Sequence, residues 1–127
     1  MLRTILGALG GLVAWAVVIS VINLGLRHMM TGYAVAEKAI AFTLPMMFAR
    51  LAMAAITSLA AGAVTRAIAP ASRAAPWIVG LVMLALFVPV HVQLWARFPV
   101  WYHLFFLLTL APLVALGAQI RLRGRSA

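Results

Sequence analysis

The chain has 127 residues, of which 67% are hydrophobic and 9% charged, and its mean hydropathy is +1.16. This composition excludes an ordinary soluble domain, whose surface needs far more charge, and is typical of a membrane protein with several spans. The net charge of +9 comes from Lys and Arg side chains that lie mostly at the ends of apolar runs, so we predict no nucleic-acid partner. The absence of cysteine excludes disulfides, a thiol nucleophile and a thiolate metal site.

Four apolar segments are each long enough to cross the hydrocarbon core of a bilayer, which takes about 20 helical residues. They cover residues 5–26, 44–68, 77–94 and 100–120. The first resembles a secretory signal, with Arg3 before it and "AWA" inside it, but its apolar run continues too far for a cleaved signal. Short connections between the later segments favour antiparallel neighbours. We therefore predict an all-α integral membrane four-helix bundle, formed by a single transmembrane domain over residues 1–127.

The residues that flank the segments predict the orientation. With the N-terminus inside, six basic residues lie on the cytoplasmic side and three on the outer side, the distribution that the positive-inside rule favours. The six are Arg3, Arg66, Arg73, Arg121, Arg123 and Arg125, and the three are Arg27, Lys38 and Arg97. Aromatic residues fit the interfaces, with Trp77 inside and Tyr33, Trp95, Trp101 and Tyr102 outside, while Trp15 lies in mid-span for packing or lipid contact. We therefore predict that both termini are cytoplasmic.

The longest connection, over about residues 27–43, joins the first two segments on the outer side. Its stretch "YAVAEKAIAF" could form a short interfacial helix or extend the second span beyond the membrane. Thr43 before Pro45 predicts the start of a helix, because proline is tolerated in a first helical turn.

Small residues recur in three of the segments, mostly at intervals of four. They predict close helix packing, which holds membrane helices together where lipid removes the hydrophobic preference between them. The residues are Gly7 and Gly11 in the first segment, Ala54, Ser58 and Gly62 in the second, and Ala111, Ala115, Gly117 and Ala118 in the fourth. Pro89 and Pro112 lie inside the third and fourth segments and predict kinks there.

Arg50 is a charged residue within the second segment, about six residues and therefore about 9 Å from its start. On a helical wheel it shares a small, weakly polar face with Ala54, Thr57, Ala61 and Thr65, while Met53, Ile56 and Leu59 lie toward the other side. Small faces pack against protein, so we expect Arg50 to point into the bundle. Its guanidinium could then reach the headgroups, join a hydrogen-bond network or bind a ligand.

The predicted threading gathers polar side chains in the outer half of the membrane, and all three histidines fall there. The set is Asn23, Arg27, His28, Arg50, His91, Gln93, Tyr102 and His103. Three interpretations stay open. These are ordinary interfacial residues at helix ends; or the histidines bind a metal or haem; or an outward-facing cavity binds an anionic or quinone-like headgroup and is lined by Arg50, His91, His103 and Asn23.

The sequence carries little that favours a cofactor or catalysis. The histidine spacing matches no ligand motif and no acid lies within a span, so we predict no metal and no cofactor. Glu37, the sole acid, lies in the outer loop and could pair with Arg50 if that loop folds back. One acid cannot supply a carboxylate pair, and no nucleophile elbow, zinc-protease motif or phosphate loop is present, so we predict that the protein is not an enzyme.

The layout resembles a group of uncharacterised small bacterial membrane proteins with four spans. The likeness lies in "MLRTILGALGGLVAWAVV", in the small-rich "LAAGAVTRAIA" and, most distinctively, in "FPVWYHLFFLLTLAPLVALGA". The resemblance implies this fold and a bacterial inner-membrane setting, and it brings no functional site.

These patterns predict a non-catalytic accessory or interaction subunit in the inner membrane. Its expected partners are the lipid bilayer and either another membrane protein or a second copy of the chain. The alternative is a small transporter or ligand-binding protein with an outward-facing polar site.

Overall fold

The computed structural model describes residues 2–126, and their side chains as far as Gln119. Within this range the chain is helical and has no strand. The elements in order are α1 (Leu2–Met29), α2 (Tyr33–Ala39), α3 (Leu44–Ile68), α4 (Ala74–Gln93), the short 3₁₀ helix η1 (Trp95–Arg97) and α5 (Val100–Ser126). The four long helices confirm the predicted all-α four-helix membrane bundle.

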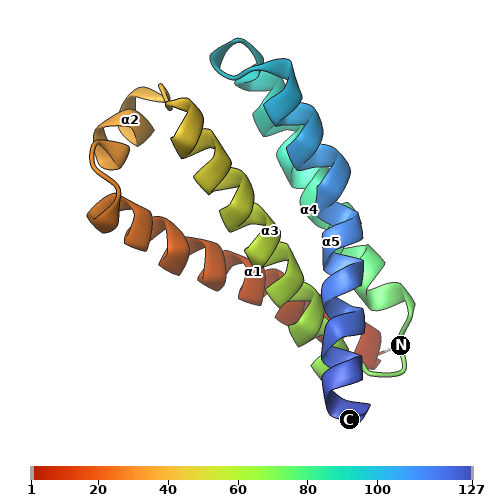
Figure 1. The fold of residues 1–127 in the computed structure, drawn as a ribbon. Helices are drawn as coiled ribbons and strands as arrows, with labels where there is room; N and C mark the ends of the chain where they lie inside the picture. Colours follow the sequence, from red (N-terminus) through yellow and green to blue (C-terminus); the bar gives the residue numbers. More distant parts are fainter. Residues whose placement is uncertain (1, 127) are drawn as a thin grey trace.

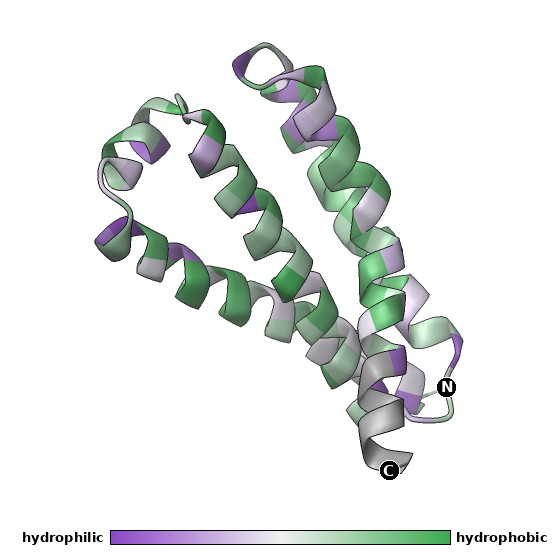
Figure 2. Cartoon of the chain, viewed as in Figure 1, coloured by the Kyte–Doolittle hydropathy of each residue, from purple (hydrophilic) through white to green (hydrophobic). Residues whose placement is uncertain are grey.

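Each of the four long helices is long and apolar enough to cross a membrane. Their bounds agree closely with the predicted spans: α3 has the predicted limits, α1 is three residues longer at each end, and α4 begins at Ala74 and ends at Gln93. Figure 2 shows that apolar residues cover these helices, while hydrophilic residues gather at the helix ends and connections. Pro89 and Pro112 lie within continuous helices.

The two ends of the bundle differ. Both chain termini lie at one end, here called the terminal end, whereas α2 and η1 lie at the opposite end, here called the α2 end (Figure 1). Helix α3 is central, because it packs along both α1 and α5, and α4 packs against α5 and α1. This arrangement brings side chains from α1, α2, α3 and α5 together at the α2 end.

Glycines bring α3 and α5 into backbone contact toward the terminal end. A Cβ atom added to Gly62 would overlap the carbonyl oxygen of Val114, and one added to Gly117 would overlap that of Leu59. Gly11 of α1 is equally close to Thr65 of α3. Only glycine permits such close approach, as small-residue helix packing requires. The predicted role of small residues in packing is therefore confirmed.

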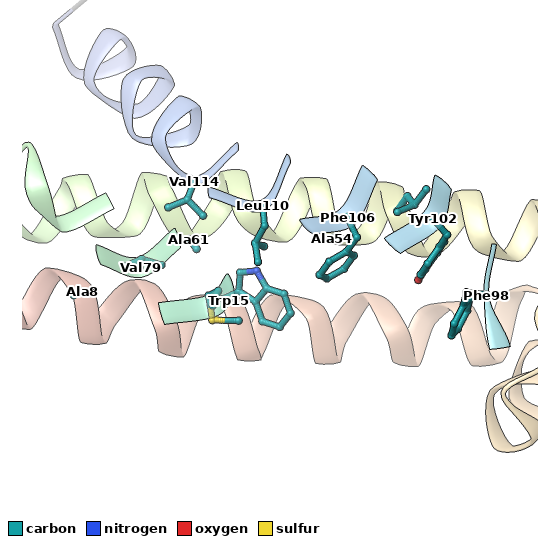
Figure 3. Close-up of a cluster of buried hydrophobic side chains, with 12 residues drawn as sticks. Ala8, Trp15, Ala54, Ala61, Val79, Phe98, Tyr102, Phe106, Leu110 and Val114 are labelled. Carbon is teal, nitrogen blue, oxygen red and sulfur yellow. The ribbon is translucent and has the colours of Figure 1, made fainter. Parts of the chain in front are cut away.

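The buried core changes in character along the bundle. Figure 3 shows Ala8, Ala61 and Val79 along one part of the α1–α3 interface, the aromatic side chains of Phe98, Tyr102 and Phe106 along the other, and Trp15 between them. Trp15 is 5% exposed and its ring lies 5.1 Å from that of Phe87, so it packs inside the bundle.

The face of α3 that includes Arg50 is buried, as predicted. Thr57, Ala61 and Thr65 are each 0% exposed, and Ile56 on the opposite side is 54% exposed. Met53 was predicted to lie toward that opposite side, but it is buried. The reason is that α1 packs beside it, so α3 is covered on more than one face.

The long connection folds back over the bundle as a separate short helix. Residues with left-handed backbone, Gly32 before α2 and Ile40 after it, separate α2 from its neighbours. Tyr33 is completely buried in a cluster with Ala36 and Met46. The backbone N–H of Met46 donates to the Thr43 hydroxyl at 3.4 Å, which confirms the predicted start of α3.

Candidate functional site

Arg50 lies on the second turn of α3 and is held between two tyrosines from other elements. Its Nε donates to the Tyr102 hydroxyl of α5 at 3.2 Å, and its Nη1 donates to the Tyr33 hydroxyl of α2 at 2.8 Å. Its Cζ lies 4.6 Å from the centre of the Phe42 ring, which adds a cation–π contact. The sequence left three roles open for Arg50, and the structure shows one of them, membership of a hydrogen-bond network.

The hydrogen bonds continue from Tyr33 to the end of α1. The Tyr33 hydroxyl donates to Asn23 Oδ1 at 2.7 Å, and Asn23 Nδ2 donates to Glu37 Oε2 at 2.7 Å. Arg27 Nε donates to Glu37 Oε1 at 2.6 Å and forms an ion pair with it. We call this continuous set the polar network; its members are Asn23, Arg27, Tyr33, Glu37, Arg50 and Tyr102. It connects α1, α2, α3 and α5.

Glu37 has a different partner from the one that the sequence suggested. The loop does fold back, but the carboxylate binds Arg27 and Asn23, and it reaches Arg50 only through Asn23 and Tyr33. The reason is geometric: α2 packs on the end of α1, where Asn23 and Arg27 lie one helical turn apart. The hydrogen bond from Arg27 is the main cause that holds the pKa of Glu37 below its ordinary value.

Tyr33 is the centre of the network and is buried on all sides. Burial raises the pKa of its hydroxyl above the ordinary value, which keeps the group neutral. A neutral hydroxyl can accept from Arg50 and donate to Asn23 at once, as the two distances show. One side chain of α2 therefore connects α3 with α1.

His91 of α4 and His103 of α5 form a second, separate pair. Their Nδ1 atoms lie 2.7 Å apart, and His103 Nε2 lies 3.2 Å from the carbonyl oxygen of Trp95. Because a carbonyl oxygen only accepts, His103 Nε2 carries a hydrogen and donates it. In neutral His103 the Nδ1 atom is then the acceptor, so His91 Nδ1 is the donor. The pair joins α4, α5 and the connection between them.

Aromatic rings enclose the histidine pair. The Trp95 ring stacks on that of His103 at 4.7 Å, and the Phe106 ring lies 4.7 Å from that of His91. His91 is 7% exposed and His103 is 0% exposed, so both side chains are buried within the protein. Tyr102 connects the two polar groups of the α2 end, because it binds Arg50 and its ring lies 6.2 Å from that of His91.

The four predicted site residues are therefore divided between two places. Arg50 and Asn23 belong to the polar network, and His91 and His103 bind each other. A groove of about 180 Å³ opens between α1, α2 and α3, and we call it the α1–α3 groove. Its lining residues are Ile19, Ser20, Asn23, Glu37, Arg50 and Met53, which include neither histidine.

The paired histidines are the nearest approach to a metal-ligand set at this end. Among the described side chains, no third histidine and no carboxylate completes a group with them. The sequence placed Tyr33 and Tyr102 at an interface and so missed their role as hydrogen-bond partners of Arg50. One signal for Tyr33 is present, because Tyr33, Ala36 and Glu37 share one face of a short helix at positions i, i+3 and i+4.

Comparison with known proteins adds no relative. No model of a known protein family, no curated protein and no solved structure matches the chain. The resemblance to small bacterial four-span proteins therefore stays a prediction. The polar network, the histidine pair and the α1–α3 groove are the features from which a function can be inferred.

Proposed function

We propose that this protein is a non-catalytic accessory subunit of a bacterial inner membrane, with both termini in the cytoplasm. In this role it acts through contact with another membrane-embedded protein and needs no cofactor. Four apolar helices with both ends of the chain on one side support a multi-pass arrangement of this kind.

The observation that carries the proposal is that the polar side chains of the α2 end bind one another. Arg50 donates to two tyrosines, and the carboxylate of Glu37 accepts from Arg27 and Asn23. General acid–base catalysis needs a positioned group that can take a proton from a substrate or give one to it. Here the sole carboxylate and the intramembrane guanidinium instead connect helices, which supports a structural role for this end of the bundle.

A contact surface for a partner is available on α3. Ala60, Ala63, Val64 and Ala67 line a shallow groove of about 330 Å³ on one face of the helix. They are spaced i, i+3, i+4 and i+7, and small side chains at such positions let a second helix approach closely. The partner that fits this face is a single membrane-spanning helix with small residues of its own.

Site-specific photocrosslinking in intact membranes tests the accessory role. A photoreactive residue at Ala63 should form one defined adduct with another protein, whereas one at Leu108, which is 71% exposed on α5, should not. Equal labelling at the two positions, or no protein adduct at Ala63, would contradict the proposal.

The proposed orientation is tested by labelling in intact cells. Because the chain has no cysteine, single cysteines can be introduced at the exposed positions Ala71 and Thr31 without any background. An impermeant thiol reagent should label the Thr31 variant and leave the Ala71 variant unlabelled until the cells are broken. The reverse pattern would overturn the assignment of sides.

A second role, binding of a small ligand, is favoured by one specific observation. The α1–α3 groove contains Arg50, Asn23 and Glu37, so two opposite charges line one space between α1, α2 and α3. The sequence predicted ligand binding at this end with the histidines included, and the groove supports it without them.

A further inference from the structure

The groups that line the α1–α3 groove keep unused hydrogen-bonding capacity. A guanidinium has five N–H donors, and Arg50 uses one on Nε and one on Nη1 for its tyrosines. A carboxylate offers about four acceptor positions, and Glu37 uses one on each oxygen for Asn23 and Arg27. A positive donor and a negative acceptor therefore both remain open to a ligand in this groove.

The two charges come from different elements. Arg50 is six residues into α3 and so about 9 Å from the start of that helix, whereas Glu37 lies on α2, outside the four long helices. A ligand in the groove therefore meets a cation from a membrane-spanning helix and an anion from the connection between two such helices. A lipid headgroup that joins a phosphate to a terminal ammonium carries the complementary pair of opposite charges.

The groove is also of suitable size and access. Its volume of about 180 Å³ is well above the roughly 15 Å³ that one water molecule needs, so it has room for a polar group of headgroup size. Ser20, on its α1 side, is exposed, and Ser20 donates only to the carbonyl oxygen of Ala16 one turn earlier. The apolar side chains of Ile19 and Met53 complete the lining beside the charged groups.

We propose that the α1–α3 groove binds a zwitterionic phospholipid headgroup of the phosphoethanolamine type, with its phosphate on Arg50 and its ammonium on Glu37. This proposal rests on the ligand-binding role given above and names its ligand. A phosphocholine headgroup carries the same charges but no N–H donor for the carboxylate. An anionic headgroup has the phosphate but brings no ammonium donor for the acceptor positions of Glu37 that Arg27 and Asn23 leave open. Both should bind less well than phosphoethanolamine.

The test uses the full chain in nanodiscs of phosphatidylglycerol that contain equal small fractions of phosphatidylethanolamine and phosphatidylcholine. Lipids that remain bound after extraction are counted by native mass spectrometry. Phosphatidylethanolamine should be enriched about tenfold over phosphatidylcholine, the ratio expected from one hydrogen bond between charged groups. Soluble glycerophosphoethanolamine, added to the same nanodiscs, should not compete if the ligand is the lipid.

Matched variants separate the site from the rest of the protein. Ser20→Phe fills the groove from an exposed position and should abolish the enrichment, while Val21→Phe, on the next and lipid-exposed residue, should leave it unchanged. Glu37→Gln should remove the preference over phosphatidylcholine, and Lys38→Gln, its neighbour on α2, should keep it.

The possible results separate the ligand from the site. Equal retention of the three lipids, all lost in Ser20→Phe, would overturn the phosphoethanolamine assignment and leave a binding site in place. Retention that Ser20→Phe does not change would overturn both the assignment and the ligand-binding role. Competition by glycerophosphoethanolamine would overturn the lipid as the source of the ligand.

Discussion

The terminal end and the α2 end of this bundle are held together by different physical means. Toward the terminal end, Gly62 and Gly117 bring the backbones of α3 and α5 into contact. At the α2 end the core is aromatic, and Arg50 and the tyrosines make hydrogen bonds across four helices. Backbone contact tolerates no added atom, whereas a network of side chains can lose a member and rearrange. The two ends should therefore respond differently to substitution.

The largest effect is expected at the glycine contact. Gly62→Val should destabilise the protein by about 3 kcal/mol or more, because the added Cβ and its two methyl groups must fit where the Val114 carbonyl already lies. The measurement is the free energy of unfolding in detergent micelles. Gly25→Val is the matched control, since a Cβ there meets nothing within 4 Å. Similar losses at the two positions would show that the change reflects helix propensity and not packing.

Removal of the central charge should have a smaller effect. Arg50→Met removes the guanidinium that donates to the hydroxyls of Tyr33 and Tyr102. This should lower the free energy of unfolding by about 2 kcal/mol. Because α2 is then less firmly held, trypsin should cleave after Lys38 faster than in the parent protein. Arg73→Met, an exposed change at the terminal end, serves as the control. An unchanged cleavage rate in Arg50→Met would contradict a role of Arg50 in holding α2.

Substitution of one histidine of the pair should lower the free energy of unfolding by about 1 kcal/mol. The effects of the two substitutions should not add. His103→Phe leaves His91 Nδ1 without its acceptor and the Trp95 carbonyl without its donor. The double variant His91→Phe with His103→Phe removes both partners of the shared hydrogen bond. Its loss of unfolding free energy should therefore be smaller than the sum of the two single losses. Simple addition would show that the two rings do not interact.

Acidification should produce the smallest change, confined to the α2 end. The pKa of Glu37 is lower in the folded protein than in an unfolded chain, where it is about 4.3. Its stabilising effect is therefore fully present above that value and is lost as the pH falls through the lower, folded pKa. Trypsin is inactive at such a low pH, so the measurement is the rate at which pepsin cleaves the α2 segment. The Glu37→Gln variant should lose this pH dependence, and Lys38→Gln should retain it.

Much of the fold follows from the sequence because the physics of the bilayer is simple. Apolar length alone gives the four spans, and α3 begins at Leu44 as Thr43 and Pro45 predict. The glycine contacts follow from the spacing of small residues, although the choice of partners, Val114 for Gly62 and Leu59 for Gly117, does not. Helix-packing angles depend on all side chains at the contact, and no short pattern encodes them.

The site was predictable only in part. The sequence places Arg50, Asn23, His91 and His103 at one end of the bundle, and the structure agrees. It does not reveal that Tyr33 lies between Arg50 and Asn23, because this depends on how the connection between α1 and α3 folds back. The rotation of α4 and α5 turns the histidines toward each other, and their spacing along the chain does not fix that rotation.

The central claim is that the polar network holds α2 and α3 together, and a double-mutant cycle on Arg50 and Tyr33 tests it most directly. The unfolding free energy is measured for Arg50→Met, Tyr33→Phe and the double variant. Because the two side chains share one hydrogen bond of 2.8 Å, their coupling energy should be about 1 kcal/mol or more, with the double variant little worse than either single one. Losses that add to within about 0.3 kcal/mol would contradict the account.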